Sequence, residues 1–428
     1  MIVELAIKSL RNRKVTAGLT VLSIALSVLL LLGVERIRHE SRESFAATIS
    51  GTDLVVGART SPVHLLLSAV FHIGNATTNI SWKSYRAIAG RPQVAWTIPL
   101  SLGDSHRGYR VLGTSSDYFE HLRFAHDRRL ALAQGRAIED EHDTVLGADV
   151  AQSLKYRVGD SIVIAHGAGE VGFSLHADHP FRVSGVLART GTPVDRTVHV
   201  TLEGLDAVHA AHDEGYAADP LAGALRSGRR VAAPDGQVHG EDANPRSITA
   251  FLVGLDSRGA ALAMQRQINE FGGEPLIAIL PAATLQELWE ITAAVEKTLF
   301  AVSALVVVVG LAGMLVALLT GLSERRREMA ILRSVGARPL HVFALILGEA
   351  AFLTVLGIAL GLAALYLVLI AGRFWLESRL GLYVAVGWPS AYELGLIAVV
   401  GTAGVLIGLI PAYRIYRYSL ADGMTVRI

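Results

Sequence analysis

The sequence GLSERRREMAILRSVGARP (residues 321–339) places a short charged segment between two long apolar runs. Met329, Leu332 and Val335 follow one another at three-residue steps, which predicts one apolar face of a helix. Gly336 and the final proline come directly after that face, where a left-handed cap and a helix stop are usual. We therefore expect a short helix that ends near Val335.

The apolar runs on either side belong to a set of four. The chain has 428 residues, of which 51% are hydrophobic, and its mean hydropathy is +0.42. A helix of about 20 residues, at roughly 1.5 Å per residue, spans the hydrocarbon core of a bilayer. We predict an α+β membrane protein with four transmembrane helices, at residues 15–34, 299–322, 340–372 and 393–412.

The basic residues orient these helices. Twelve Lys and Arg residues lie near the amino terminus, in the loop after the second run and in the carboxyl-terminal tail. The short loop 373–392 on the opposite side has only Arg373 and Arg379. Because Lys and Arg accumulate on the cytoplasmic side of membrane proteins, we expect both termini in the cytoplasm.

Three segments are then cytoplasmic. Residues 1–14 place apolar and basic positions at helical spacing, which predicts an amphipathic helix on the inner membrane surface. The other two are the charged segment 323–338 and the tail 413–428. Residues 35–298 are left outside, which is enough chain for one or two small domains, and helical patterns at its two ends predict stalks.

The outer segment predicts a domain in two separated halves. Strand and helix patterns over about residues 45–115 are matched by a second set over about residues 247–282, and residues 116–246 between them are rich in strand patterns. Within the first half, we expect Gln93 to Gly103 and Arg107 to Gly113 to be strands linked by a Gly-Asp-Ser turn. The architecture is therefore an α/β lobe split around a β-rich insert.

The sequence lacks the common motifs for nucleotide binding and for hydrolysis. The sequence has no Gly-x-x-x-x-Gly-Lys-Ser/Thr loop for nucleotide phosphates, no Gly-x-Ser-x-Gly and no His-Glu-x-x-His. The outer segment has more acidic than basic residues, so we expect no nucleic-acid partner. We predict a non-catalytic chain without a cofactor, and because 14 residues precede the first run we expect no ATPase domain fused at the amino terminus.

The histidines allow two interpretations. Of the 15 in the chain, 14 lie in the outer segment, where His176 with His179 and His209 with His212 form two His-x-x-His pairs. On a helix each pair would face one way and could bind zinc or a similar ion. The alternative is a set of scattered surface histidines.

Two features of the membrane helices stand out. Glu349 is a carboxylate near the inner end of the third run, where we expect a packing or hydrogen-bonding role in preference to ion transport. Gly357 with Gly361, and Gly404 with Gly408, are small residues at four-residue spacing that allow close helix approach, within one chain or between two.

The string ERRREMAILRSVGA (residues 324–337), followed by LILGEA (residues 345–350), resembles the signature of the FtsX/MacB-type permeases of type VII ABC transporters, which include MacB and LolC/LolE. In that family the segment is a coupling helix that docks on a separate ATPase subunit. The resemblance implies nine docking residues here. They are Glu324, Arg325, Arg326, Arg327, Glu328, Met329, Leu332, Arg333 and Gly336.

The insert also resembles a MacB-type periplasmic core domain. The similarity lies in the order of a Leu146-Gly147 step, a short helix, a Val158-Gly-Asp strand and a Phe181-x-Val-x-Gly-Val strand. It implies a porter-like α/β lobe in two halves and a β-rich, sabre-like insert, both in the periplasm.

The resemblance implies a function. It describes a permease homodimer in a bacterial inner membrane, in contact with membrane lipids and two ABC ATPase subunits that bind ATP and Mg. ATP hydrolysis would move the periplasmic domain, a process called mechanotransmission, and so drive efflux or lipoprotein handling with a periplasmic adaptor or lipoprotein. The alternatives are an FtsX-like regulator of a periplasmic cell-wall hydrolase, which does not transport, and a metal- or haem-handling permease.

Overall fold

The chain forms two compact units in the computed structural model. The membrane unit comprises Met1–Ser41 and Thr292–Ile428, and the α/β unit comprises Arg42–Ile291. The structure describes residues 14–48, 50–74, 78–125, 127–166, 180–208, 247–334, 338–380 and 387–416, without the side chains of residues 258, 322–334 and 373–380.

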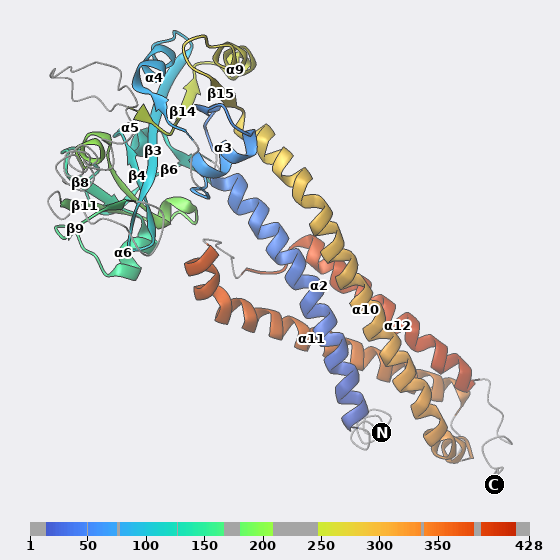
Figure 1. Ribbon diagram of the computed structural model, residues 1–428. Coiled ribbons are helices and arrows are strands. Elements are labelled where there is room, and N and C mark those ends of the chain that lie inside the picture. The colour runs from blue at the N-terminus through green and yellow to red at the C-terminus, as the bar shows by residue number, and fades with distance from the viewer. Residues whose placement is uncertain are drawn as a thin grey trace, which may run out of the picture. The chain divides into compact units, whose positions relative to one another are not determined.

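Four long helices dominate the membrane unit (Figure 1). They are α2 (Lys14–Thr48), α10 (Pro281–Ser334), α11 (Pro339–Leu380) and α12 (Ala391–Tyr416). Each is long and apolar enough to span a membrane, and the α/β unit lies in the sequence between the first and the second. The predicted fold class is therefore confirmed.

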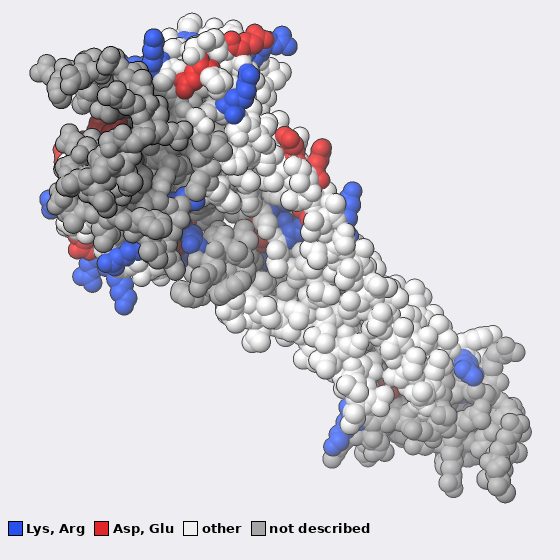
Figure 2. Space-filling model, in the orientation of Figure 1, with Lys and Arg blue, Asp and Glu red and all other residues white. Residues whose placement is uncertain are grey.

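The interior of the membrane unit draws side chains from all four helices. Ile24 and Val28 of α2 pack in one cluster with Met314 of α10, Leu353 of α11 and Val400 of α12. The outward faces of the helices are apolar as well, and Figure 2 shows their middle surface without charged side chains. A helix that is apolar all round suits a lipid environment.

Two helices are longer than the sequence suggests. Helix α10 runs without interruption through the predicted stalk, span and charged segment, so residues 323–334 are the end of a long helix and not a separate short one. No proline interrupts it between Pro281 and Ser334, so its backbone ladder can continue. Helix α11 reaches Leu380 and includes the first part of the predicted loop 373–392.

The α/β unit is built on one sheet of eleven strands. Nine follow one another in the order β15, β1, β14, β3, β4, β12, β8, β11, β7, with β10 paired to β3 and β9 to β11. Their bounds are β15 Leu276–Ile279, β1 Leu54–Ala58, β14 Ala250–Leu255, β3 Val94–His106, β4 Tyr109–Thr114, β12 Thr197–Thr201, β8 Asp143–Leu146, β11 Phe181–Leu187, β7 Leu132–Gly135, β10 Ala165–His166 and β9 Ser161–Ile162. Two short pairs complete the strands, β2 Ile80–Ser81 with β13 Ser247–Ile248, and β5 Arg123–Phe124 with β6 Arg128–Arg129.

The two separated halves of the α/β lobe meet through β1. This strand lies antiparallel between β14 and β15, so Val55 is opposite Leu252 on one side and Ile279 on the other. The insert joins the same sheet, because β12 pairs in parallel with β4, with Val198 opposite Val111. The α/β lobe and the insert therefore share one continuous sheet.

Short helices cover this sheet. They are α3 Pro62–Ala69, α4 Trp82–Ala89, α5 Asp117–His121, α6 Ala148–Leu154 and α9 Ala261–Asn269, with 3₁₀ turns at Pro193–Arg196 and Arg258–Ala260. Figure 1 shows α4 and α9 beside β14 and β15 at one end of the unit, and α6 near β8, β9 and β11 at the other. In β1, Val55 packs into one hydrophobic cluster whereas Leu54 and Val56 pack into another, so both faces of the sheet are buried.

The predicted turn at Gly103-Asp104-Ser105 is wrong. Strand β3 continues through these residues to His106, with a register shift against β4 between Leu102 and Ser105. The chain reverses at Arg107 and Gly108, whose φ angles are 48° and 85°. Positive φ at both central residues is the geometry of a type I′ hairpin turn, which matches the twist of the strands. The Gly-Asp-Ser step is instead an irregularity within β3.

His199 is a buried base in this sheet. It lies in β12, its side chain is fully buried, and its Nδ1 donates to the Val145 carbonyl oxygen at 3.1 Å. Among the described residues its Nε2 has no hydrogen-bond partner. Burial lowers the pKa of His199 to about 4, although the bond to Val145 favours the charged form.

Acidification should therefore destabilise the α/β unit. The unfolded chain binds a proton near pH 6.5, whereas folded His199 does not until about pH 4, so unfolding free energy falls between these values. At pH 4.5 the loss from this group is about 2 to 3 kcal/mol. Thermal unfolding followed by tryptophan fluorescence between pH 7 and 4.5 measures it.

His199→Asn isolates this contribution, because asparagine can still donate to Val145 but does not titrate. Its melting temperature should fall less on acidification than that of the wild type. The exposed His142, replaced by Gln, is the control and should keep the wild-type pH dependence. An unchanged pH dependence in His199→Asn would refute the assignment.

Candidate functional site

The predicted ATPase-docking segment forms the last part of α10. Residues 323–334 are helical, but the side chains of the docking residues in this segment lie outside the described part of the structure, as does Gly336. Their docking role stays a prediction. The histidine pairs His176 with His179 and His209 with His212 also lie outside the described residues.

The four glycines predicted to bring helices together lie at helix crossings within the chain. A Cβ on Gly357 would lie 2.6 Å from the Ile24 Cγ2 of α2. One on Gly361 would lie 2.8 Å from both the Ala25 carbonyl oxygen and the Val28 Cβ. Helix α11 therefore approaches α2 closely enough for its glycines to contact backbone, a spacing that only glycine permits.

The second glycine pair joins α12 to α11. A Cβ on Gly404 would overlap the Thr354 side chain, and one on Gly408 would lie 2.5 Å from the Ala350 Cβ. The Thr354 side chain is held in one orientation, because its Oγ1 donates a hydrogen bond to the Ala350 carbonyl oxygen at 2.7 Å. Both glycine pairs are thus used for contacts inside one chain.

A third close contact escaped the sequence analysis. A Cβ on Gly310 of α10 would lie 2.7 Å from the Ser27 Oγ of α2. Ser27 Oγ is 2.8 Å from the carbonyl oxygen of Ser23 and 3.1 Å from that of Val306. A hydroxyl that reaches a neighbouring helix fixes the pair in apolar surroundings. Gly310 has no glycine partner four residues away, so the spacing rule could not find it.

A buried ion pair joins α2 to the start of α12 in the membrane unit. Arg36 of α2 is 6% exposed, and its Nη1 lies 3.0 Å from the Glu393 Oε2 of α12, which is 4% exposed. The same guanidinium donates to the Gly387 carbonyl oxygen at 3.2 Å and approaches that of Trp388 at 3.4 Å. Its Nε lies 3.3 Å from the Glu40 carboxylate.

Glu393 also caps α12. The Ser390 backbone N–H donates to its Oε2 at 2.7 Å, while the Glu393 N–H donates to the Ser390 Oγ at 3.2 Å. This reciprocal pair is a capping box. The pattern Ser-Ala-Tyr-Glu at residues 390–393 could have revealed the cap from sequence, but nothing local in the sequence points to Arg36.

The ion pair connects segments far apart in the chain. It fixes the backbone of the α11–α12 connection and the start of α12 to α2 through one guanidinium. Tyr366 of α11 contributes as well, since its hydroxyl donates to the Gly387 carbonyl oxygen at 2.8 Å. A buried charge that is paired with a carboxylate and hydrogen-bonded to backbone carbonyls holds its surroundings in one arrangement, because losing its partner leaves it desolvated and unpaired.

Two further features belong to the membrane unit. Glu349 is buried, with 9% of its surface exposed, beside the buried Ala350. An apolar groove between α2 and α11 is lined by side chains such as Leu22, Leu26 and Phe352. Its lining is almost wholly apolar, which suits contact with lipid chains.

Family comparisons agree with this architecture. The FtsX-like permease C-terminal family matches residues 300–420. The MacB-like periplasmic core domain family matches residues 17–237, just over half of the chain.

Two curated relatives are similar over shorter segments. The pyoverdine export ATP-binding/permease protein PvdT of Pseudomonas fluorescens is 33% identical over 125 residues, which are 29% of this chain and 18% of that protein. The macrolide export ATP-binding/permease protein MacB of Syntrophobacter fumaroxidans is 28% identical over 190 residues, 40% and 24% of the two chains. The matched segments thus cover about a quarter or less of these relatives.

Two solved structures were also matched. The periplasmic region of MacB from Actinobacillus actinomycetemcomitans has 11% identity and a TM-score of 0.34, covering 57% of this chain and 96% of that one. The extracellular domain of the transporter YknZ from Gram-positive bacteria has 13% identity and a TM-score of 0.29, covering 53% and 99%.

Four helices long and apolar enough to span a membrane, with a mixed α/β unit between the first and second, define a membrane protein with a large inserted domain. More particularly, the chain belongs to the FtsX/MacB-like permeases of ABC transporters. The resemblance seen in the sequence is therefore confirmed.

Replacing Gly361 by Ala should destabilise the membrane unit. The added methyl group would meet the Ala25 backbone and Val28, and overpacking of this kind costs about 1 to 3 kcal/mol. The melting temperature of the purified chain, followed by circular dichroism, should fall. Gly348→Ala in the same helix is the matched control, because its Cβ would meet nothing within 4 Å. Equal melting temperatures for the two variants would contradict the close packing.

Replacing Glu393 by Ala should lower the stability of the membrane unit more than Gly361→Ala does. The substitution leaves Arg36 buried without its carboxylate partner and removes the α12 cap. Loss of one member of a buried ion pair costs about 3 to 5 kcal/mol. Tyr392→Ala, at the adjacent exposed position, is the control and should change the melting temperature little. If Glu393→Ala melts like this control, the ion pair does not stabilise the unit.

Proposed function

We propose that this permease transmits the work of ATP hydrolysis from a separate ATPase subunit to its α/β unit. The ATPase binds ATP and Mg, and this chain is the non-catalytic partner. Both termini and the end of α10 face the cytoplasm of a bacterial inner membrane, and the α/β unit faces the periplasm. This orientation rests on the excess of Lys and Arg in the three segments assigned to the cytoplasm.

The observation that carries the proposal is the continuity of α10. One helix of 54 residues contains the outer stalk, the membrane span and the docking segment. At 1.5 Å per residue its length is about 80 Å, far more than the thickness of a bilayer. A continuous helix keeps its backbone hydrogen bonds when it is displaced. A force on residues 323–334 would therefore displace the whole of α10.

The docking segment offers both charge and apolar surface to a partner. The sequence Glu-Arg-Arg-Arg-Glu at residues 324–328 supplies the polar contacts, and Met329 and Leu332 supply the apolar ones. Charges at the edge of an interface steer association and fix its register, whereas buried apolar side chains contribute most of the affinity. Two such chains would place two docking segments against two ATPase subunits.

Export is the direction that the relatives favour. PvdT is described as a pyoverdine export protein and MacB as a macrolide export protein. We propose that the α/β unit acts on a substrate outside the membrane, with a periplasmic adaptor or lipoprotein as a further partner.

Charge reversal at Glu324 and Glu328 tests the proposal. The double variant Glu324→Lys and Glu328→Lys should assemble poorly with its ATPase, which is identified by affinity purification of the tagged wild-type chain from native membranes and mass spectrometry. Permease-stimulated ATP hydrolysis should fall by about tenfold or more, the effect of about 1.4 kcal/mol at the interface.

A matched control lies on the same helix. Glu287 and Glu290 are exposed at the outer end of α10, and their replacement by Lys makes the same change of charge. This control should leave stimulation intact, and both variants should melt like the wild type. Full stimulation by the docking variant, or the absence of an ATPase from the wild-type preparation under crosslinking, would overturn the proposal.

A further inference from the structure

Helix α5 carries a group of side chains that the transport function does not use. This single turn, Asp117–His121, follows β4 and packs on β3. It brings together Asp117, Glu120 and His121, at positions i, i+3 and i+4, which share one face of a helix. A carboxylate oxygen of each acid and a ring nitrogen of the histidine all lie within 4.8 Å of one another.

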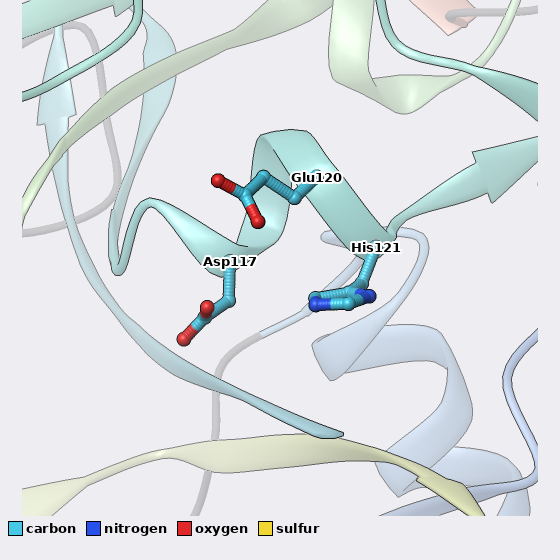
Figure 3. A group of neighbouring side chains, drawn as sticks. All are labelled: Asp117, Glu120 and His121. Carbon is cyan, nitrogen blue, oxygen red and sulfur yellow. The ribbon is translucent and has the colours of Figure 1, made fainter. Parts of the chain in front are cut away.

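Figure 3 shows the three side chains projecting from this turn toward a common space beside it. Asp117 and His121 are half-buried, and Glu120 is exposed. The space can therefore be reached from solvent. Tyr118, on another face of the turn, is 3% exposed and packs against the ring of His199 in the core, which holds the turn in place.

The imidazole is oriented by its neighbours. The His121 ring stacks on Trp96 of β3, with ring centroids 5.3 Å apart and planes 9° from parallel. Trp96 in turn lies over Gly254 of β14, where any Cβ would overlap the indole. A stacked ring keeps its nitrogens at the edge, where they can bind a ligand in the plane of the ring.

The ligand atoms of this group have few other partners. Asp117 accepts a hydrogen bond from the Ser115 Oγ at 3.1 Å. Among the described residues, no hydrogen bond or ion pair engages the Glu120 carboxylate or the His121 ring. In the described part of the chain no Lys or Arg forms an ion pair with either acid, and the nearby Arg123 guanidinium donates to the Glu120 backbone carbonyl oxygen.

We propose that Asp117, Glu120 and His121 bind a divalent first-row transition metal ion. Two carboxylates balance its charge, and one neutral imidazole nitrogen favours ions of the zinc, nickel and cobalt type over magnesium or calcium. Metal–ligand bonds of about 2.1 Å bring ligand atoms to within about 4 Å of one another. A small rotation of the exposed Glu120 side chain closes the remaining distance.

The site uses none of the residues of the two His-x-x-His pairs and is open. Three protein ligands leave coordination positions for water or for a group from a partner protein, whereas closed structural sites use four. The ion would fix the short turn between β4 and β5 of the α/β unit. In the sequence, Asp-x-x-Glu-His contains only one histidine and lacks the paired-histidine pattern of a metal site.

Cobalt titration of the full-length chain in lipid nanodiscs tests this site, with a tag that contains no histidine. Co²⁺ bound at His121 lies beside Trp96 and should quench the fluorescence of that residue. The chain has five tryptophans, so only part of the total emission should be lost. His121→Gln and Glu120→Gln should each raise the midpoint of quenching by about tenfold or more. Excess Mg²⁺ should not restore the emission.

Two controls separate this site from other histidines. Trp96→Phe keeps a ring for His121 to stack on and should abolish the quenching while metal binding, measured by equilibrium dialysis, remains. The exposed His142, replaced by Gln, should leave the titration unchanged. Quenching in His121→Gln with the wild-type midpoint, or none in the wild type at millimolar Co²⁺, would overturn the proposal.

Discussion

The hydrocarbon core of a bilayer contains no water, so each segment that crosses it must pair its own backbone groups, and the design of this permease depends on that constraint. Four helices meet the requirement individually, and their association depends on contacts other than the hydrophobic effect. Glycine and hydroxyl groups supply these contacts, at Gly361 against α2, Gly404 against Thr354, and Ser27 against α10. Close packing between helices, and not the burial of apolar surface, therefore determines which helix faces pair.

Where the spans reach water, the stabilising interactions change. At the start of α12, Arg36 and Glu393 form a buried pair, in which Arg36 also donates to a backbone carbonyl and Glu393 also caps the helix. Inside the α/β unit, specificity comes from strand pairing. Residues on either side of the insert meet at β1, so this unit cannot form until most of its chain is present.

Helix α10 is one continuous helix of 54 residues. Helices α2 and α10 each contain residues of both compact units, so the span and stalk of each are one piece of secondary structure. The proposed function uses α10 as the rod that an ATPase moves. A packed sheet such as that of the α/β unit resists small distortions. Under the proposed function, movement of α10 would therefore shift the sheet as a rigid unit and would not deform it.

The sequence by itself determined the family and the four spans, because hydropathy, helical periodicity and the motif at residues 324–337 are local properties of the chain. It did not predict the unbroken length of α10 or the turn at Arg107 and Gly108, where several local conformations compete. Only the tertiary structure paired Arg36 with Glu393 and stacked His121 on Trp96. Such contacts join side chains from separate elements, and their partners are chosen by the packing of whole helices and strands, which no short stretch of sequence encodes.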